Sequence, residues 1–152
     1  MNSQALLTHM DDIVPLMREQ LAAGKSVRFS PKGISMLPML RQGKDSVVLS
    51  PLPEVLRKYD LPLYQRSDGK YILHRIVSVG QTYTCIGDNQ YSYEPGVRRE
   101  QMIALVTSFT RGKREISVED PLYRLYCRLW HCSRGLRYFL HRVKNRLRRM
   151  LK

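Results

Sequence analysis

The first segment with a clear apolar pattern is residues 9–23, where apolar side chains recur at steps of three and four. This spacing predicts a short amphipathic helix. Thr8 is a suitable N-cap for it, and Gly24 marks its end. We expect Ile13, Leu16, Met17 and Leu21 to form the apolar face of this helix.

From there to about residue 118 the pattern changes to short β-prone runs separated by turn residues. The candidate strands are residues 26–29, 46–50, 61–66, 71–79, 82–87 and 102–111. The sequences "SDGK" (67–70) and "VGQT" (79–82) predict hairpin turns between neighbouring strands. Many short strands with tight turns favour a mainly β fold, a sandwich or a partly closed barrel.

A second helical pattern begins at residue 119 and continues to the end of the chain. Asp120 can cap this helix, Pro121 suits its first position, and Gly135 is expected to kink or divide it. We therefore expect a β domain with an N-terminal helix over 1–118 and an amphipathic helical tail over 119–152. The apolar stripe of the tail comprises Leu122, Leu125, Leu129, Cys132, Leu136, Phe139 or Leu140, Val143, Leu147 and Met150.

The net charge of +13 is concentrated in this tail. Residues 1–120 carry 16 Lys/Arg against 13 Asp/Glu, a net charge of +3, whereas residues 121–152 carry ten Lys/Arg and no acid. Three interpretations stay open for the tail. It lies on an anionic membrane surface, it packs on the β domain or on a partner protein, or, least favoured, it binds nucleic acid.

Other features indicate the compartment. The three cysteines are no disulfide framework, no apolar run of about 18 residues predicts a membrane span, and the N-terminus does not resemble a secretory signal. We expect a cytoplasmic protein, with peripheral attachment to the inner face of the membrane as an option. Cys127, His131 and Cys132 lack a second ligand pair at the spacing of a zinc finger, so no metal or other cofactor is predicted.

Candidate chemistry begins at Ser35, within "SPKGISMLPML" (30–40). Gly33 allows a positive φ or a close backbone approach, and Pro38 prevents Leu37 from continuing a helix. Such a bend can present a serine at the edge of a β structure. A serine alone is more often an ordinary turn residue, because its hydroxyl is a weak nucleophile without a neighbouring base.

The candidate base is His74 in "YILHRIVSV", a run with apolar residues on both faces. Asp88, in "CIGDNQY", follows a strand and a glycine, where a carboxylate can orient a histidine ring. Taken singly, each has an ordinary explanation as a core histidine or a turn aspartate. Their occurrence together with Ser35 favours a catalytic set.

In this order the motifs resemble a known superfamily. "GISMLPML" with the following "RQGKD" is similar to the Ser-Met-x-Pro segment and Gly-Asp of type I signal peptidases and LexA-like self-cleaving proteases. "KYDLPLYQR" resembles the next strand of that family, "YILHRIVSV" its base-bearing strand and "CIGDNQY" its Gly-Asp-Asn box. The resemblance covers roughly residues 26–112. Because a histidine stands where most bacterial members carry lysine, it is closer to the archaeal and endoplasmic-reticulum branch.

The resemblance implies a serine endopeptidase that cleaves a peptide or preprotein, with Ser35 as nucleophile, His74 as general base and Asp88 as orienting acid. Many bacterial members add an oxyanion hydroxyl where this chain has Gly33, and Glu94 is the nearest counterpart of a second acid in related enzymes. The alternative is a non-catalytic, peptidase-like scaffold whose basic tail binds an anionic membrane or a partner protein.

Overall fold

The computed structural model describes residues 10–150. Its helices are α1 (Met10–Ala22), η1 (Arg99–Gln101, a 3₁₀ turn), α2 (Pro121–Cys132) and α3 (Arg134–Met150). Its strands are β1 (Val27–Phe29), β2 (Val47–Ser50), β3 (Pro62–Gln65), β4 (Tyr71–Leu73), β5 (Arg75–Val79), β6 (Tyr83–Ile86), β7 (Glu94–Val97), β8 (Met102–Arg111) and β9 (Arg114–Ser117). The predicted cap Thr8 lies outside the described residues.

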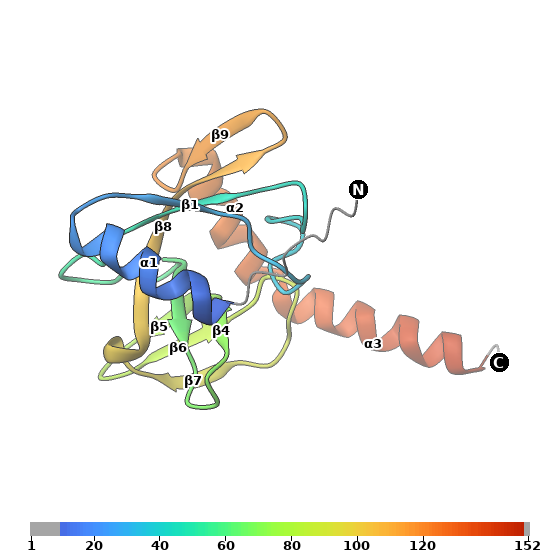
Figure 1. Cartoon of the computed structure of the whole chain (residues 1–152). Coiled ribbons are helices and arrows are strands. Elements are labelled where there is room, and N and C mark those ends of the chain that lie inside the picture. Colours follow the sequence, from blue (N-terminus) through green and yellow to red (C-terminus); the bar gives the residue numbers. More distant parts are fainter. Residues whose placement is uncertain (1–9, 151–152) are drawn as a thin grey trace, which may run out of the picture.

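The strands form two antiparallel sheets (Figure 1). The larger has the order β1-β2-β8-β3-β4, with β9 paired to the end of β8, and the smaller has the order β5-β6-β7. Within residues 10–150 about 29% of the residues lie in strands, three α-helices accompany them, and the sheets form no closed barrel. The prediction of a mainly β fold is therefore corrected to a mixed one, whereas the short N-terminal and the C-terminal helices are confirmed.

The run 71–79, predicted as one strand, is divided at His74. β4 pairs with β3 in the larger sheet, and β5 pairs with β6 in the smaller sheet, so the chain passes from one sheet to the other at this histidine. The apolar residues on both faces of the run reflect this crossing. The "SDGK" hairpin is confirmed between β3 and β4, where Gly69 has a φ of 84° that glycine adopts without strain.

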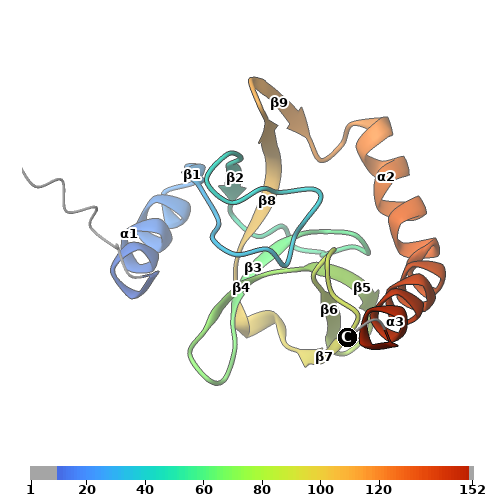
Figure 2. The ribbon, with the colours of Figure 1, turned by 90° about the vertical axis from the view of Figure 1, so that its right-hand side faces the viewer.

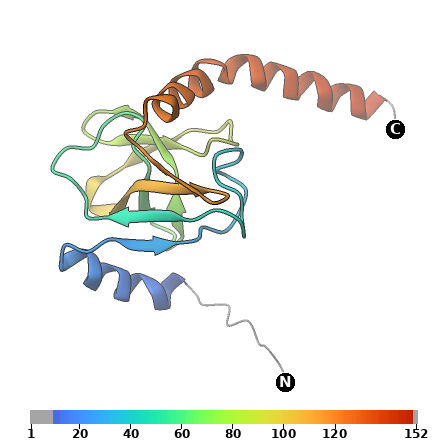
Figure 3. The same ribbon diagram turned by 90° about the horizontal axis from the view of Figure 1, so that it is seen from above.

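Two apolar clusters hold the layers together, and β3 contributes to both. Leu63 belongs to the cluster that includes residues of α1, the Ser35 loop and α2, whereas Tyr64 belongs to the cluster that includes residues of the smaller sheet. Alternate residues of a strand point to opposite faces, so β3 is buried on both of them. Figures 2 and 3 show α1 on one side of the strands and α2 with α3 on the other.

The predicted tail helix is two helices that meet at Ser133. Asp120 caps α2 as expected, accepting hydrogen bonds from the backbone N–H groups of Leu122 and Tyr123. The division comes two residues before Gly135, which lies in the first turn of α3. Strands β7 and β9 were not predicted, because β7 contains Pro and Gly and most side chains of both strands remain accessible to solvent.

Candidate active site

The loop that carries Ser35 connects β1 to β2, and hydrogen bonds and buried side chains hold it against the rest of the domain. Gly33 has a φ of 95°, and its N–H donates to Gln42 Oε1 at 2.7 Å, which closes the bend before the serine. Arg111 at the end of β8 donates to the carbonyl oxygens of Pro38 and Met39. The loop side chains buried in the main core are Met36, Met39 and Leu40.

The turn after β6 holds the other side of this loop. The backbone N–H of Asn89 donates to the carbonyl oxygen of Ser35 at 2.8 Å, and the Asn89 side chain donates to that of Ile34 at 3.1 Å. A Cβ at Gly87 would come within 2.6 Å of the Ser35 carbonyl oxygen, so only glycine permits this approach. The "GDN" segment thus positions the Ser35 backbone.

Ser35 and His74 line the same small pocket, with a volume of about 120 Å³. Within residues 10–150 the Ser35 hydroxyl and backbone N–H have no hydrogen-bond partner, so both are free to meet a ligand. The His74 side chain is 4% exposed, and it enters the pocket from the point where the chain changes sheets. Two residues distant in sequence therefore line one pocket, and no hydrogen bond joins the Ser35 hydroxyl to the imidazole within residues 10–150.

A partly buried acidic group lies behind the histidine, and it belongs to Glu94 at the start of β7. His74 Nδ1 lies 3.7 Å from Glu94 Oε2 and 3.5 Å from the Tyr64 hydroxyl. That hydroxyl donates to Glu94 Oε2 at 2.6 Å, and Arg66 pairs with both oxygens of the carboxylate at 2.5 and 2.6 Å. This network occupies the Nδ1 side of the imidazole and leaves Nε2 without a partner in the described part of the chain.

The surroundings keep His74 neutral near pH 7. Burial lowers the pKa of His74 to about 4, although Glu94 acts in the opposite direction. Burial also acts to raise the pKa of Glu94, but hydrogen bonds from Arg66 and Tyr64 outweigh it and lower that pKa. The result is a neutral imidazole, able to accept a proton, with Nδ1 3.7 Å from a charged carboxylate.

Asp88 occupies a different position from the one the sequence predicted. Its carboxylate forms a two-pronged pair with Arg75, with Nε–Oδ1 and Nη2–Oδ2 distances of 2.8 Å, and it accepts a third bond from the Tyr126 hydroxyl. Both members of the pair are fully buried. Arg75 follows His74 in the chain, and a buried guanidinium requires an anion, so it takes the carboxylate that was assigned to the histidine.

Glu94 and Gln42 belong to the pocket or its network, but the sequence carries only weak signals for these roles. Glu94 lies six residues after Asp88, beyond the "GDN" segment, and nothing in its local pattern pairs it with Arg66 across 28 positions. Gln42 also lines the pocket, and its amide N–H₂ has no acceptor among the described residues. For Asp88 the sequence does hold a signal. Arg75 follows His74 in an apolar run, and a buried arginine needs a carboxylate partner.

A larger groove of about 1080 Å³ adjoins the pocket, and we call it the β1–β4 groove. Residues of β1 and β4, the two end strands of the larger sheet, line it together with the first turn of α1. It shares Pro31, Lys32 and the whole of β4 with the wall of the Ser35 pocket. The groove therefore leads from the strand edges to the serine.

Comparison with models of protein families, with curated proteins and with solved structures finds no match. Within residues 10–150, no three His, Cys, Asp or Glu side chains gather in a way that would hold a metal ion.

Proposed function

We propose that this chain is a serine endopeptidase of the signal-peptidase-like class, with Ser35 as nucleophile and His74 as general base. The observation that carries the proposal is the pocket shared by the free Ser35 hydroxyl and a neutral, buried imidazole backed by a carboxylate. A serine becomes an effective nucleophile when a positioned base accepts its proton. The resemblance of the three motifs to signal peptidases supports the same reaction.

In this mechanism His74 Nε2 accepts the proton of Ser35 Oγ as the oxygen attacks the peptide carbonyl. The Ser35–carbonyl carbon bond forms, and the resulting oxyanion faces the Ser35 N–H, a contribution typically worth about 3 kcal/mol. The proton then passes from His74 to the leaving amine, and the C–N bond breaks. Water, deprotonated by His74, releases the acyl group from Ser35.

We propose Glu94 in place of Asp88 as the acid that orients His74. Glu94 Oε2 is 3.7 Å from Nδ1, whereas the Asp88 oxygens bond to Arg75 and Tyr126. We assign Gln42 as the second oxyanion donor. Its amide lines the pocket beside Gly33, the position at which many bacterial signal peptidases carry the hydroxyl that binds the oxyanion.

An extended peptide is the substrate that suits the β1–β4 groove. End strands present backbone N–H and C=O groups that a peptide can pair with, and the side chains beside them select alternate residues of the ligand. The groove ends at the Ser35 pocket, so a bound peptide would run toward the nucleophile.

Labelling with a fluorophosphonate probe tests this function without knowledge of the substrate. We expect one adduct, located by peptide mapping on Ser35, and its loss in His74→Ala. Ser78→Ala is the matched control, since Ser78 is an exposed serine on β5 outside the pocket. Absence of labelling in the folded protein, or a label elsewhere, would reject the catalytic assignment in favour of a non-catalytic scaffold.

The role of Glu94 can be tested by measuring the rate of Ser35 labelling as a function of pH. Because His74 is neutral down to a pKa of about 4, the labelling rate should stay constant as pH falls from neutral and decline only near that value. Glu94→Gln removes the charge that raises the pKa of His74, so the decline should shift to lower pH. The rate at neutral pH should fall by about 10²-fold, because the developing imidazolium loses its counter-charge.

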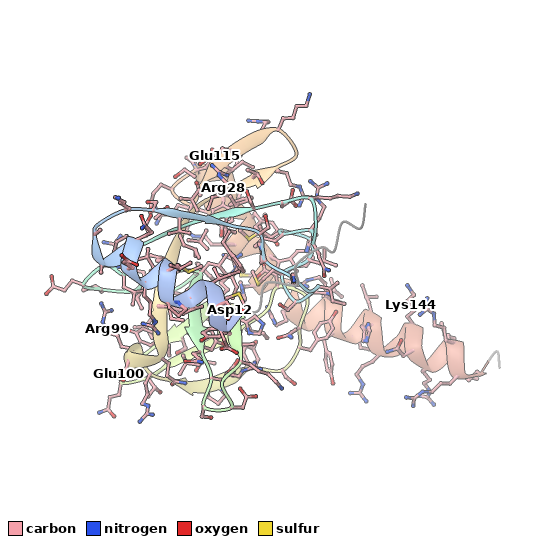
Figure 4. The ribbon with its side chains drawn as sticks, viewed as in Figure 1. Asp12, Arg28, Arg99, Glu100, Glu115 and Lys144 are labelled. Carbon is pink, nitrogen blue, oxygen red and sulfur yellow. The ribbon has the colours of Figure 1, made fainter. Side chains whose placement is uncertain are left out.

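Glu100→Gln is the control for this experiment, since Glu100 lies in η1 at the edge of the body, away from the pocket (Figure 4). It should keep both the rate and the profile of the unmodified protein. A Glu94→Gln variant with an unchanged profile would reject the orienting role while leaving Ser35 and His74 to be judged by the labelling.

A further inference from the structure

The outward side of α2 is apolar and has no partner in the described structure. Tyr123 and Cys127 face the core, and Trp130 donates to the Asp88 carbonyl oxygen at 2.8 Å, so these residues mark the side that packs on the strands. Leu122, Leu125 and Leu129 recur at steps of three and four on another side and are exposed. Together with Tyr126 and Trp130 they line a shallow hollow on the surface.

α3 continues this pattern as it leaves the body of the molecule (Figures 1 and 3). Its large aliphatic residues and Phe139 fall within an arc of about 100° at about 3.6 residues per turn. All of them are exposed: Leu136, Phe139, Leu140, Val143, Leu147 and Met150. We call these six residues and the three leucines of α2 the arm stripe.

The opposite side of α3 is the one that contacts the domain. The rings of Tyr138 and His141 lie 5.1 and 5.3 Å from that of Tyr91. Near the start of α3, Arg134 donates to the Gln90 carbonyl oxygen at 2.5 Å, and the Arg137 guanidinium lies 3.6 Å from the centre of the Trp130 ring. Because α3 packs through its polar side, most of the arm stripe is directed away from the domain. Leu140, at the edge of the stripe, lines a hollow with Pro38 and Tyr91.

The charges around the arm stripe indicate what covers it. Residues 121–150 carry nine Lys/Arg and no Asp/Glu, and Figure 4 shows Lys144 projecting from α3. Arg142 and Arg146 lie on α3 beside the stripe, and Arg124 and Arg128 are exposed on α2. An apolar strip bordered by cations on a helix suits a surface with anionic groups above a hydrocarbon layer.

We propose that α2 and α3 lie in the interface of an anionic lipid bilayer, with the arm stripe facing the acyl chains and the arginines facing the headgroups. A second copy of the chain is disfavoured as the occupant, because it would bring the same positive charge to the same stripe. Nucleic acid would neutralise the cations but leave the nine apolar residues in water.

The proposal concerns a helix that lies on a membrane, and it does not depend on catalysis by Ser35. Of the helices in residues 10–150, none is both long and apolar enough to cross a bilayer. The anchor of α2 on the "GDN" turn, through Trp130 and Tyr126, gives the arm a defined orientation relative to the domain.

Co-sedimentation of the full chain with vesicles tests this proposal. We expect binding to vesicles of phosphatidylcholine with phosphatidylserine, weaker binding to phosphatidylcholine alone, and loss of the difference as salt is added. The double variant Phe139→Gln/Leu147→Gln removes two exposed stripe residues without changing the charge. Its affinity for the anionic vesicles should fall by about tenfold or more.

The matched control is Leu16→Gln/Val55→Gln, because these residues are as exposed, at 65% and 66%, and lie outside the arm. It should bind like the unmodified chain, and circular dichroism of both variants should show that the helices remain. Failure of the unmodified chain to bind, or equal binding by the stripe variant, would overturn the proposal. So would a self-associated form, seen by sedimentation velocity, that buries the stripe and excludes vesicles.

Discussion

Replacing Ser35 with alanine is expected to lower peptide hydrolysis by at least about 10³-fold, because the acyl-enzyme route requires its oxygen. The effect on stability should be small. The Ser35 hydroxyl has no hydrogen-bond partner within residues 10–150, and the backbone contacts that hold its loop, such as Asn89 N–H to the Ser35 carbonyl oxygen, remain in the variant. The substitution therefore separates chemistry from folding.

The measurement is hydrolysis of a library of internally quenched peptides, with urea denaturation run in parallel on the same preparations. Ser78→Ala again serves as the control, and it should retain full activity. If the unmodified chain cleaves peptides and Ser35→Ala does so at the same rate, then Ser35 is not the nucleophile, whatever the pocket geometry.

The local elements were largely predictable, whereas their assembly was not. The Asp120 cap and the "SDGK" turn depend on neighbouring residues, so their sequence signals are strong. The crossing at His74 depends on which sheet each half of residues 71–79 joins, which is decided by pairing with β3 and β6. Strand β7 forms despite Pro95 and Gly96, because pairing with β6 overrides local preference.

In the candidate site, too, the local motifs were predictable from the sequence and the partners across the fold were not. The pocket shared by Ser35 and His74 follows from motifs that each carry a recognisable local pattern. The choice between Asp88 and Glu94 does not, because it depends on which carboxylate the buried Arg75 takes. Burial of an arginine is a property of the assembled fold. Because Arg75 is buried, Asp88 pairs with its guanidinium and not with His74.

Asp88→Ala is accordingly expected to be the most destabilising of these substitutions. It leaves the Arg75 guanidinium buried without its anion, a change that typically costs about 3–5 kcal/mol of unfolding free energy. The loss should extend to α2, because Arg75 also donates to the Tyr123 hydroxyl at 2.8 Å and Tyr126 donates to Asp88. Urea denaturation followed by circular dichroism measures the first effect, and hydrogen exchange of α2 measures the second.

Two comparisons make this prediction specific to a buried pair. Glu115→Ala breaks the Arg28–Glu115 pair, which lies outside the Ser35 pocket on the β1 and β9 side of the molecule (Figure 4). Both side chains are about half exposed, so the substitution should cost much less unfolding free energy because each charge stays hydrated. Arg75→Met/Asp88→Leu removes both charges and should recover part of the loss. Equal costs for Asp88→Ala and Glu115→Ala would contradict the structural role of Asp88. A stable Asp88→Ala variant with strongly reduced labelling of Ser35 would return the orienting role from Glu94 to Asp88.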